Sequence, residues 1–175
     1  SIMRTTILPS MLEIITRNFN YRNKAVRLYE LGKIYLPRED GLADEPKVLS
    51  LGAYGDEMDF FTLKGSVEAL LGACRIKDVR FAACTDNASY HPGRCAKVYA
   101  DGTELGVLGQ IHPLVAANYG VDAEIYAAEL NFDALYAVRG GIPVYQPLPK
   151  FPAVTRDIAV VCAEGVTVGA LEECI

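Results

Sequence analysis

Apolar side chains recur at three- and four-residue steps near the N-terminus, a spacing typical of an amphipathic helix. Over residues 7–19 these positions are Ile7, Leu8, Met11, Leu12, Ile15 and Phe19. Pro9 fits the first turn, because the N–H group that proline lacks has no partner there. A second apolar stripe follows Asp59, which we interpret as the N-cap of a helix over residues 59–76; its members are Leu63, Val67, Leu70 and Leu71.

Between the helices, alternating or continuous apolar runs predict strands over residues 25–36, 47–55, 79–84 and 124–131, the third as a short buried strand. The strongest hairpin signal covers residues 94–111, where two strand-like runs meet at Asp101 and Gly102. A short helical turn over 112–120 ends at Gly120, and Asn131 is placed to cap a helix over 132–138. Tight turns outnumber crossovers, so the pattern predicts an α+β fold, an antiparallel sheet flanked by helices.

The composition changes near residue 140, where four of the nine prolines fall within residues 140–152. We therefore predict a first domain over residues 1–140, a linker over 141–149, and a second domain that starts at 150. Residues 150–175 contain a predicted strand over 153–162 followed by a helix. Because about 25 residues cannot bury a core alone, we expect them to be the truncated start of that domain.

Composition narrows the class of protein. A hydrophobic fraction of 51% and a charged fraction of 22% suit a globular protein and no apolar run is long enough to span a membrane. The net charge of −5 argues against a large, sequence-independent surface for nucleic acid.

The N-terminus lacks the layout of a signal peptide and starts abruptly, as an excised piece would. Five cysteines without CxxC spacing indicate reduced thiols in a cytoplasmic protein.

The histidines and one cysteine raise the question of a metal or catalytic site. His91 and Cys95 are four residues apart, but His112 lies seventeen beyond Cys95, and no second pair completes a tetrahedral set. A Cys–His nucleophile pair would also lack a third group to orient the base. Each histidine precedes a proline, which favours an extended or turn conformation. We interpret both histidines as turn residues and Cys95 as a packing thiol.

The glycines match neither the GxxxxGK[ST] nor the GxGxxG phosphate-binding frame. Asp56, Glu57 and Asp59 precede a helix, where negative charge suits the helix dipole better than it indicates Mg²⁺ binding. The basic cluster between Arg17 and Arg27 is interpreted as a solvated polar end of the first helix. The residues alone therefore indicate no catalytic constellation.

Three stretches nevertheless resemble a known family. They are residues 3–36, residues 59–73 and residues 106–135, followed by FPAVTRDIAVV, and in this order they resemble the C-terminal part of the β chain of bacterial phenylalanine–tRNA ligase. The resemblance implies a class II aminoacyl-tRNA synthetase-like antiparallel sheet flanked by helices. It also implies that residues from about 150 start a ferredoxin-like domain that binds the tRNA anticodon stem.

In this family the α chain performs the chemistry, and here three motif positions depart from the active pattern. MRTTIL places Thr6 and Leu8 where an active chain has the His and Ser of LRTHTS. GKIYL places Leu36 where active members have an ATP-binding arginine. EIYAAELNFDAL offers Glu129 and Asp133 in place of the arginine of the third motif. The resemblance therefore implies that this domain holds no catalytic or ATP-binding residue and is itself inactive, and the spacing of its histidines and cysteines predicts no metal-binding residue.

The leading hypothesis is a non-catalytic structural module of a heterotetrameric ligase, which supports the catalytic α chain in attaching phenylalanine to tRNA. ATP and Mg²⁺ would serve the parent complex, and tRNA would be its nucleic-acid partner; neither DNA nor a membrane is expected. One alternative is an active ATP-dependent ligase domain that uses Lys33, Arg38 or Lys64 for phosphate. Another is a tRNA-binding module, with Lys150, Arg156 and the cluster from Arg17 to Arg27 as candidate phosphate contacts.

Overall fold

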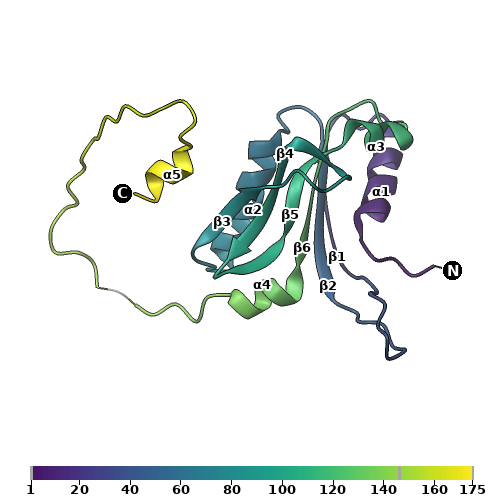
Figure 1. Ribbon diagram of the computed structural model, residues 1–175, viewed down its shortest axis with the longest axis horizontal. Helices are drawn as coiled ribbons and strands as arrows, with labels where there is room; N and C mark the ends of the chain where they lie inside the picture. The colour runs from purple at the N-terminus through teal and green to yellow at the C-terminus, as the bar shows by residue number, and fades with distance from the viewer. Residues whose placement is uncertain (1, 146, 175) are drawn as a thin grey trace. The chain divides into compact units, whose positions relative to one another are not determined.

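A six-stranded antiparallel sheet organises the first 142 residues in the computed structural model, which describes residues 2–145 and 147–174 (Figure 1). The strands follow the order β1-β2-β6-β5-β4-β3. Their bounds are β1 Val26–Lys33, β2 Lys47–Tyr54, β3 Val79–Ala83, β4 Tyr90–Ala100, β5 Thr103–Ile111 and β6 Ile125–Asn131. The predicted fold class, an antiparallel sheet flanked by helices, is confirmed.

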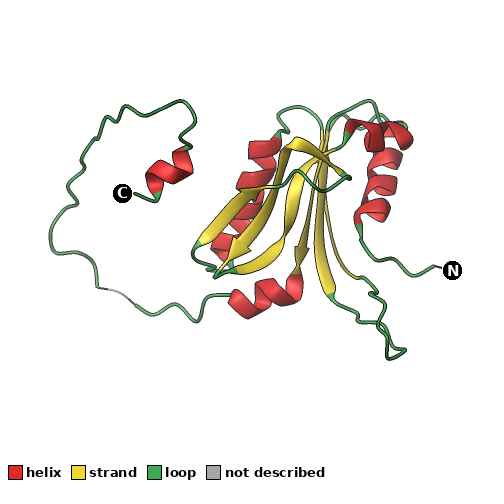
Figure 2. Ribbon diagram, viewed as in Figure 1, coloured by secondary structure: helices red, strands yellow, loops and turns green. Residues whose placement is uncertain are grey.

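Helices cover both faces of this sheet (Figure 2). α1 (Leu8–Asn20) and α3 (Pro113–Asn118) pack on one face, whereas α2 (Phe60–Ala73) and α4 (Phe132–Val138) pack on the other. Each face therefore carries a hydrophobic core of its own. The apolar stripe that predicted the first helix accounts for its side of the core, since Leu8, Met11, Leu12 and Ile15 are all buried.

Local signals set the ends of several elements as predicted. Asp101 (φ 48°) and Gly102 (φ 71°) both adopt positive φ at the turn that joins β4 to β5. Asp59 caps α2, because its Oδ1 accepts a hydrogen bond from the Thr62 N–H at 2.6 Å. Asn131 caps α4 in the same way through the Ala134 N–H at 3.0 Å.

The position of β6 gives the sheet its topology. β6 is the last strand in sequence, yet it lies between β2 and β5 and pairs with both. This arrangement brings Glu129 opposite Ser50 of β2 on one side and opposite Val107 of β5 on the other. Glu129, which is near the end of the domain in sequence, therefore lies on an inner strand of the sheet.

Two strand predictions need correction. Residues 79–84 were expected to form a buried strand, but β3 is an edge strand with mostly partly exposed or exposed side chains. Residues 153–162 form no strand, because the described part of residues 143–175 offers no neighbouring strand to complete its hydrogen bonds. The helix predicted after them does form, as α5 (Val168–Glu172), with Thr167 as its cap.

Within residues 2–145 and 147–174, the helices are too short or too polar for any of them to cross a membrane.

Candidate functional site

A carboxylate that lies 122 residues further along the chain binds the N-terminus of α1. Its N-cap residue, Ile7, provides no side-chain acceptor, so the first N–H groups of the helix need another partner. Glu129 on β6 supplies it: Oε1 accepts hydrogen bonds from the N–H of Ile7 at 2.8 Å and from that of Leu8 at 3.1 Å. The Thr6 hydroxyl donates to both carboxylate oxygens, at 2.7 and 2.8 Å. The negative charge is thereby held where the helix dipole favours it.

A pocket of about 290 Å³ opens beside this cap. Thr6, Leu36 and Glu129 all line it, so one residue from each of the three stretches that the resemblance singled out lies at this place. Glu104 is a second acidic residue of the lining, which includes no lysine or arginine among the described residues. A triphosphate here would meet two carboxylates and no cation, so the arrangement opposes ATP binding.

The remaining predicted positions of these motifs lie elsewhere. Asp133 is exposed at the start of α4, where its Oδ2 accepts a hydrogen bond from the Lys47 N–H at 3.1 Å. Leu8 is buried in the core beneath α1. Only part of the expected set is therefore brought together, because the chain turns from strand to helix between Glu129 and Asp133.

The cations proposed for an active ligase are each paired with acids of their own. Lys33 Nζ lies 2.8 Å from a Glu45 oxygen, and Lys64 pairs with Glu68 while its Nζ lies 4.4 Å from the centre of the Phe81 ring. Arg38 lies between two carboxylates, at 2.6 Å from Asp40 and at 3.0 Å from Asp44. These contacts raise the pKa of Lys33 and Arg38. None of the three cations lines the pocket beside Glu129.

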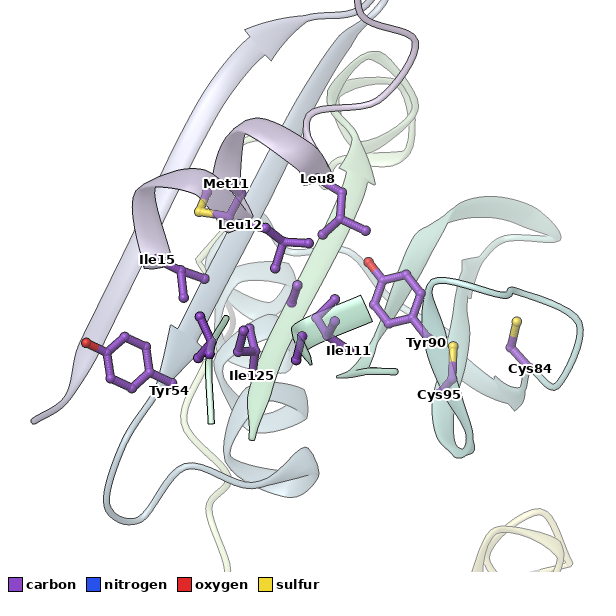
Figure 3. Packing of buried hydrophobic residues seen from close by; sticks show 13 residues of the cluster. Leu8, Met11, Leu12, Ile15, Tyr54, Cys84, Tyr90, Cys95, Ile111 and Ile125 are labelled. Atoms are coloured by element: carbon purple, nitrogen blue, oxygen red, sulfur yellow. The ribbon is translucent and has the colours of Figure 1, made fainter. Parts of the chain in front are cut away.

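Side chains fill the sheet face under α1 (Figure 3). Figure 3 shows Tyr90, Ile111 and Leu12 packed there, with the Tyr90 ring directed from β4 towards the start of α1. Burial raises the pKa of Tyr90 well above its usual value, and the negative charge of Glu129 adds to the effect. The hydroxyls of Tyr90 and Ser50 are buried with no hydrogen-bond partner among the described residues. Neither hydroxyl was singled out from the sequence, where Ser50 belongs to a predicted strand and Tyr90 precedes the predicted hairpin over residues 94–111.

His112 acts as a turn residue, as predicted, whereas the prediction for His91 is wrong: it lies within β4, in the stretch between Tyr90 and Cys95 where the pairing with β5 shifts register. His91 Nδ1 accepts a hydrogen bond from the Gly93 N–H at 3.0 Å. His112 caps α3 in the same manner, through the Leu114 N–H at 3.2 Å. Cys95 is buried, and burial together with neighbouring Cys84 raises the pKa of its thiol to about 12. Across the described residues, no three His, Cys, Asp or Glu side chains gather closely enough to hold a metal ion.

A polar network on β4, β5 and β6 was not anticipated from the sequence. Arg94 donates to Gln110 at 2.7 Å and to Glu124 at 3.0 Å, and the Tyr126 hydroxyl donates to Glu124 at 2.6 Å. The hydrogen bond from Tyr126 is the main reason that the pKa of Glu124 is lowered. Burial and the same bond raise the pKa of Tyr126 to about 12. No sequence pattern predicts this network, because its members come from segments that only the folded sheet brings together.

The candidate tRNA contacts Lys150 and Arg156 belong to residues 143–175. Both side chains are exposed, and both residues lie outside any helix or strand. Their role in RNA binding stays a prediction.

Comparison with known proteins places the chain in a family. Residues 1–132 match the model described as the phenylalanyl tRNA synthetase beta chain CLM domain. The whole chain is similar to the phenylalanine–tRNA ligase beta subunits of Clostridium acetobutylicum, at 40% identity over 177 residues, and of Clostridium tetani, at 41% over 177 residues. It spans 22% of the length of each of these relatives.

Solved structures support the fold. A pyrrolysyl tRNA synthetase, PylSc, from Desulfitobacterium hafniense superposes with a TM-score of 0.65 at 15% identity, covering 77% of this chain and 49% of the other. A second structure of that organism's pyrrolysyl-tRNA synthetase gives a TM-score of 0.62 at 14% identity, with the same coverage. At this level of identity the likeness is one of fold.

Proposed function

The chain belongs to the family of the phenylalanyl-tRNA synthetase beta chain CLM domain, and on this premise we propose that it is a structural module that does not itself activate ATP. In this proposal it is part of a phenylalanine–tRNA ligase beta subunit, where it supports a catalytic α chain that uses ATP and Mg²⁺. Residues from 150 onward begin a tRNA-binding domain, with Lys150 and Arg156 as its first phosphate contacts.

One observation carries the proposal: the carboxylate of Glu129 is bound to the first turn of α1 beside Leu36. A synthetase must attract the triphosphate of ATP at this kind of sheet, and it does so with cations. Here the Glu129 carboxylate binds the N-terminus of α1, and the uncharged Leu36 lies at the position that the resemblance assigns to an arginine.

An apolar edge supports the structural part of the proposal. β1 is an edge strand, and Tyr29 and Leu31 project from the same side of it, with 78% and 49% of their surface exposed. Neighbouring exposed apolar side chains of this size are typical of a surface that another protein covers. We assign this edge to the contact with the α chain.

Two measurements test the proposal. The purified chain is mixed with the α chain, and co-elution on size exclusion is compared for the natural sequence, for Tyr29→Ser/Leu31→Ser, and for the control Leu114→Ser, which removes an exposed leucine from α3. We expect the first variant to reduce co-elution and the control to preserve it. Equal behaviour of both variants would remove the edge assignment.

The second measurement concerns ATP. Isothermal titration of the chain with ATP and Mg²⁺ is expected to give no saturable heat, while an assembled ligase serves as the positive control. Phenylalanine-dependent exchange of pyrophosphate into ATP by the chain alone would overturn the non-catalytic part of the proposal. The result would then favour the alternative of an active ligase domain.

A further inference from the structure

Positive charge is concentrated in one short segment of an acidic chain. Residues 17–27 contain four cations and no acid, whereas the other 13 Lys and Arg and the 22 Asp and Glu give the rest of the chain a net charge of −9. The four cations, Arg17, Arg22, Lys24 and Arg27, are exposed. In the described part of the chain none of them has an ion-pair partner. Such a segment is available to an external polyanion.

Stabilisation of α1 explains only part of this cluster. Arg17 lies in the last turn of α1, where a cation interacts favourably with the helix dipole. Arg22 and Lys24 lie beyond the helix, in the turn that leads to β1, and Arg27 lies on β1 itself. Arg22 adopts a positive φ of 61°, at a turn position where glycine or asparagine would be less strained. The cations outside the helix therefore need another explanation.

A pocket of about 720 Å³ adjoins this turn. Arg22 and Lys24 line it together with Phe19 and Tyr54, whose rings lie edge to face with their centres 6.0 Å apart. The volume is within the range of sites for nucleotide-sized ligands. Tyr21, next to Arg22, is 76% exposed and offers a further aromatic surface. Tyr54 is only 3% exposed and Phe19 packs against the same core, so Tyr21 is the ring that a base can stack on. Cations beside such an exposed ring are the combination that binds single-stranded nucleic acid.

Two acids also line the pocket, Asp56 and Glu124. Glu124 is held by Arg94 at 3.0 Å and by the Tyr126 hydroxyl at 2.6 Å, so its charge is partly neutralised. A carboxylate repels phosphate, but it accepts a hydrogen bond from the exocyclic amino group of a base. The acids therefore suit a base inside the pocket, with its phosphates outside at the cations.

We propose that the turn between α1 and β1 binds single-stranded RNA, with phosphates at Arg22 and Lys24 and one unpaired, amino-bearing base in the adjoining pocket. This inference rests on the proposed function only for the identity of the polymer, since RNA is the polyanion that a tRNA ligase handles. The binding surface itself follows from the charge, the exposed ring of Tyr21 and the pocket.

Fluorescence anisotropy of labelled twelve-nucleotide oligo(C) and oligo(U) RNA with the purified 175-residue chain tests the proposal. At 50 mM salt we expect saturable binding of oligo(C), and a weakening on the order of 10-fold for Arg22→Ala/Lys24→Ala. The slope of log affinity against log salt is expected to fall by about 1.4, because each lost contact to single-stranded phosphate removes about 0.7. Circular dichroism checks that the variant folds as the natural chain does.

Lys33→Ala/Arg38→Ala is the matched control. It removes the same two charges from cations that already have acidic partners, so we expect a change of less than about twofold. An equal loss in both double variants would mean that only net charge matters, and it would overturn the site. Failure of the natural chain to bind oligo(C) at 50 mM salt would overturn it as well.

The base pocket has a test of its own. The natural chain is expected to prefer oligo(C) to oligo(U), because uracil lacks an exocyclic amino group. Asp56→Asn is expected to raise the affinity for both oligomers and to reduce this preference. No preference in the natural chain, or one that survives Asp56→Asn unchanged, would overturn the placement of the base.

These outcomes are separable from the proposed function. Arg22→Ala/Lys24→Ala is expected to co-elute with the α chain as the natural sequence does, since both residues precede β1, the strand that carries Tyr29 and Leu31. Loss of RNA binding with normal co-elution supports the inference. Co-elution by a natural chain that binds no RNA overturns the inference alone and leaves the structural module intact.

Discussion

Thr6 and Glu129 are separated by 123 residues in sequence, and the hydroxyl of the first donates to both carboxylate oxygens of the second, at 2.7 and 2.8 Å. The same carboxylate accepts the N–H groups of Ile7 and Leu8. One side chain of the central strand β6 therefore ties the start of α1 to the sheet. In the proposed function this contact also takes the place that an anionic substrate would occupy.

Replacement of the carboxylate should lower stability. We expect Glu129→Gln to reduce the free energy of unfolding by about 2 kcal/mol, because an amide offers one acceptor oxygen and no charge to three donors. Urea denaturation followed by circular dichroism measures the change. Asp133→Asn is the matched control: Asp133 is exposed and accepts a single N–H, so we expect a loss of less than about 1 kcal/mol. Equal losses of unfolding free energy in both variants would show that the Glu129 contacts contribute no more to stability than the single hydrogen bond of Asp133.

Tyr90 and Tyr126, two of the three buried tyrosines among the described residues, should respond in opposite directions when their hydroxyls are removed. The Tyr90 hydroxyl has no partner among the described residues, whereas the Tyr126 hydroxyl donates to Glu124 at 2.6 Å. Tyr90→Phe removes an unsatisfied buried polar group and should leave stability unchanged or raise it by up to about 1 kcal/mol. Tyr126→Phe breaks a hydrogen bond to a charged acceptor and should cost about 1.5 kcal/mol. Thermal unfolding of the pair checks the signs, and destabilisation by Tyr90→Phe would contradict the assignment of its hydroxyl as unpartnered.

The pKa of the Asp59 carboxyl should make the cap of α2 depend on pH. Hydrogen bonds from the side chain and backbone of Thr62 hold this pKa below its usual value. Because the folded-state pKa is the lower one, the contribution to stability is present above the unfolded value of about 3.9 and is lost as the pH falls through the folded value. Asp59→Asn keeps an acceptor for the cap but cannot ionise. We expect the natural chain to be more stable than this variant at pH 6 and the difference to vanish at acidic pH. A difference that is independent of pH would exclude the carboxylate as its source.

The cysteines should divide into two classes of reactivity. Cys162 and Cys174 are exposed, whereas Cys84 and Cys95 are buried and the pKa of Cys95 is raised to about 12. The thiolate is the reactive form, so at pH 8 we expect the exposed pair to react with an aromatic disulfide reagent far faster than Cys95. Mass spectrometry of the labelled peptides assigns each site. In denaturant the difference should disappear. Labelling of Cys95 as fast as Cys162 in the folded chain would contradict its burial.

Local chemistry made much of the fold accessible from the sequence. The caps at Asp59 and Asn131 and the turn at Asp101 and Gly102 depend on side chains and backbone angles within a few residues of one another. The apolar stripe over residues 7–19 predicted a helix equally well, because a helix that packs on a sheet needs one apolar side whichever sheet face it covers. The antiparallel class followed from the number of tight turns.

A strand pattern alone could not say where a strand lies or whether it forms. Residues 79–84 look buried in sequence but form an edge, and residues 153–162 have the pattern of a strand without a neighbour to pair with. A strand forms only where another segment supplies its hydrogen bonds, and the residues of the strand do not show whether such a segment is present.

The sequence by itself determined the helices, the caps of α2 and α4 and the hairpin, because each depends on residues that are neighbours along the chain. Only the tertiary structure decided that β6 enters between β2 and β5, and therefore that Glu129 meets Thr6 beside Leu36. Such contacts depend on the packing of segments more than a hundred residues apart. The reason is physical: periodicity shows which side of an element is buried, whereas only packing decides what buries it.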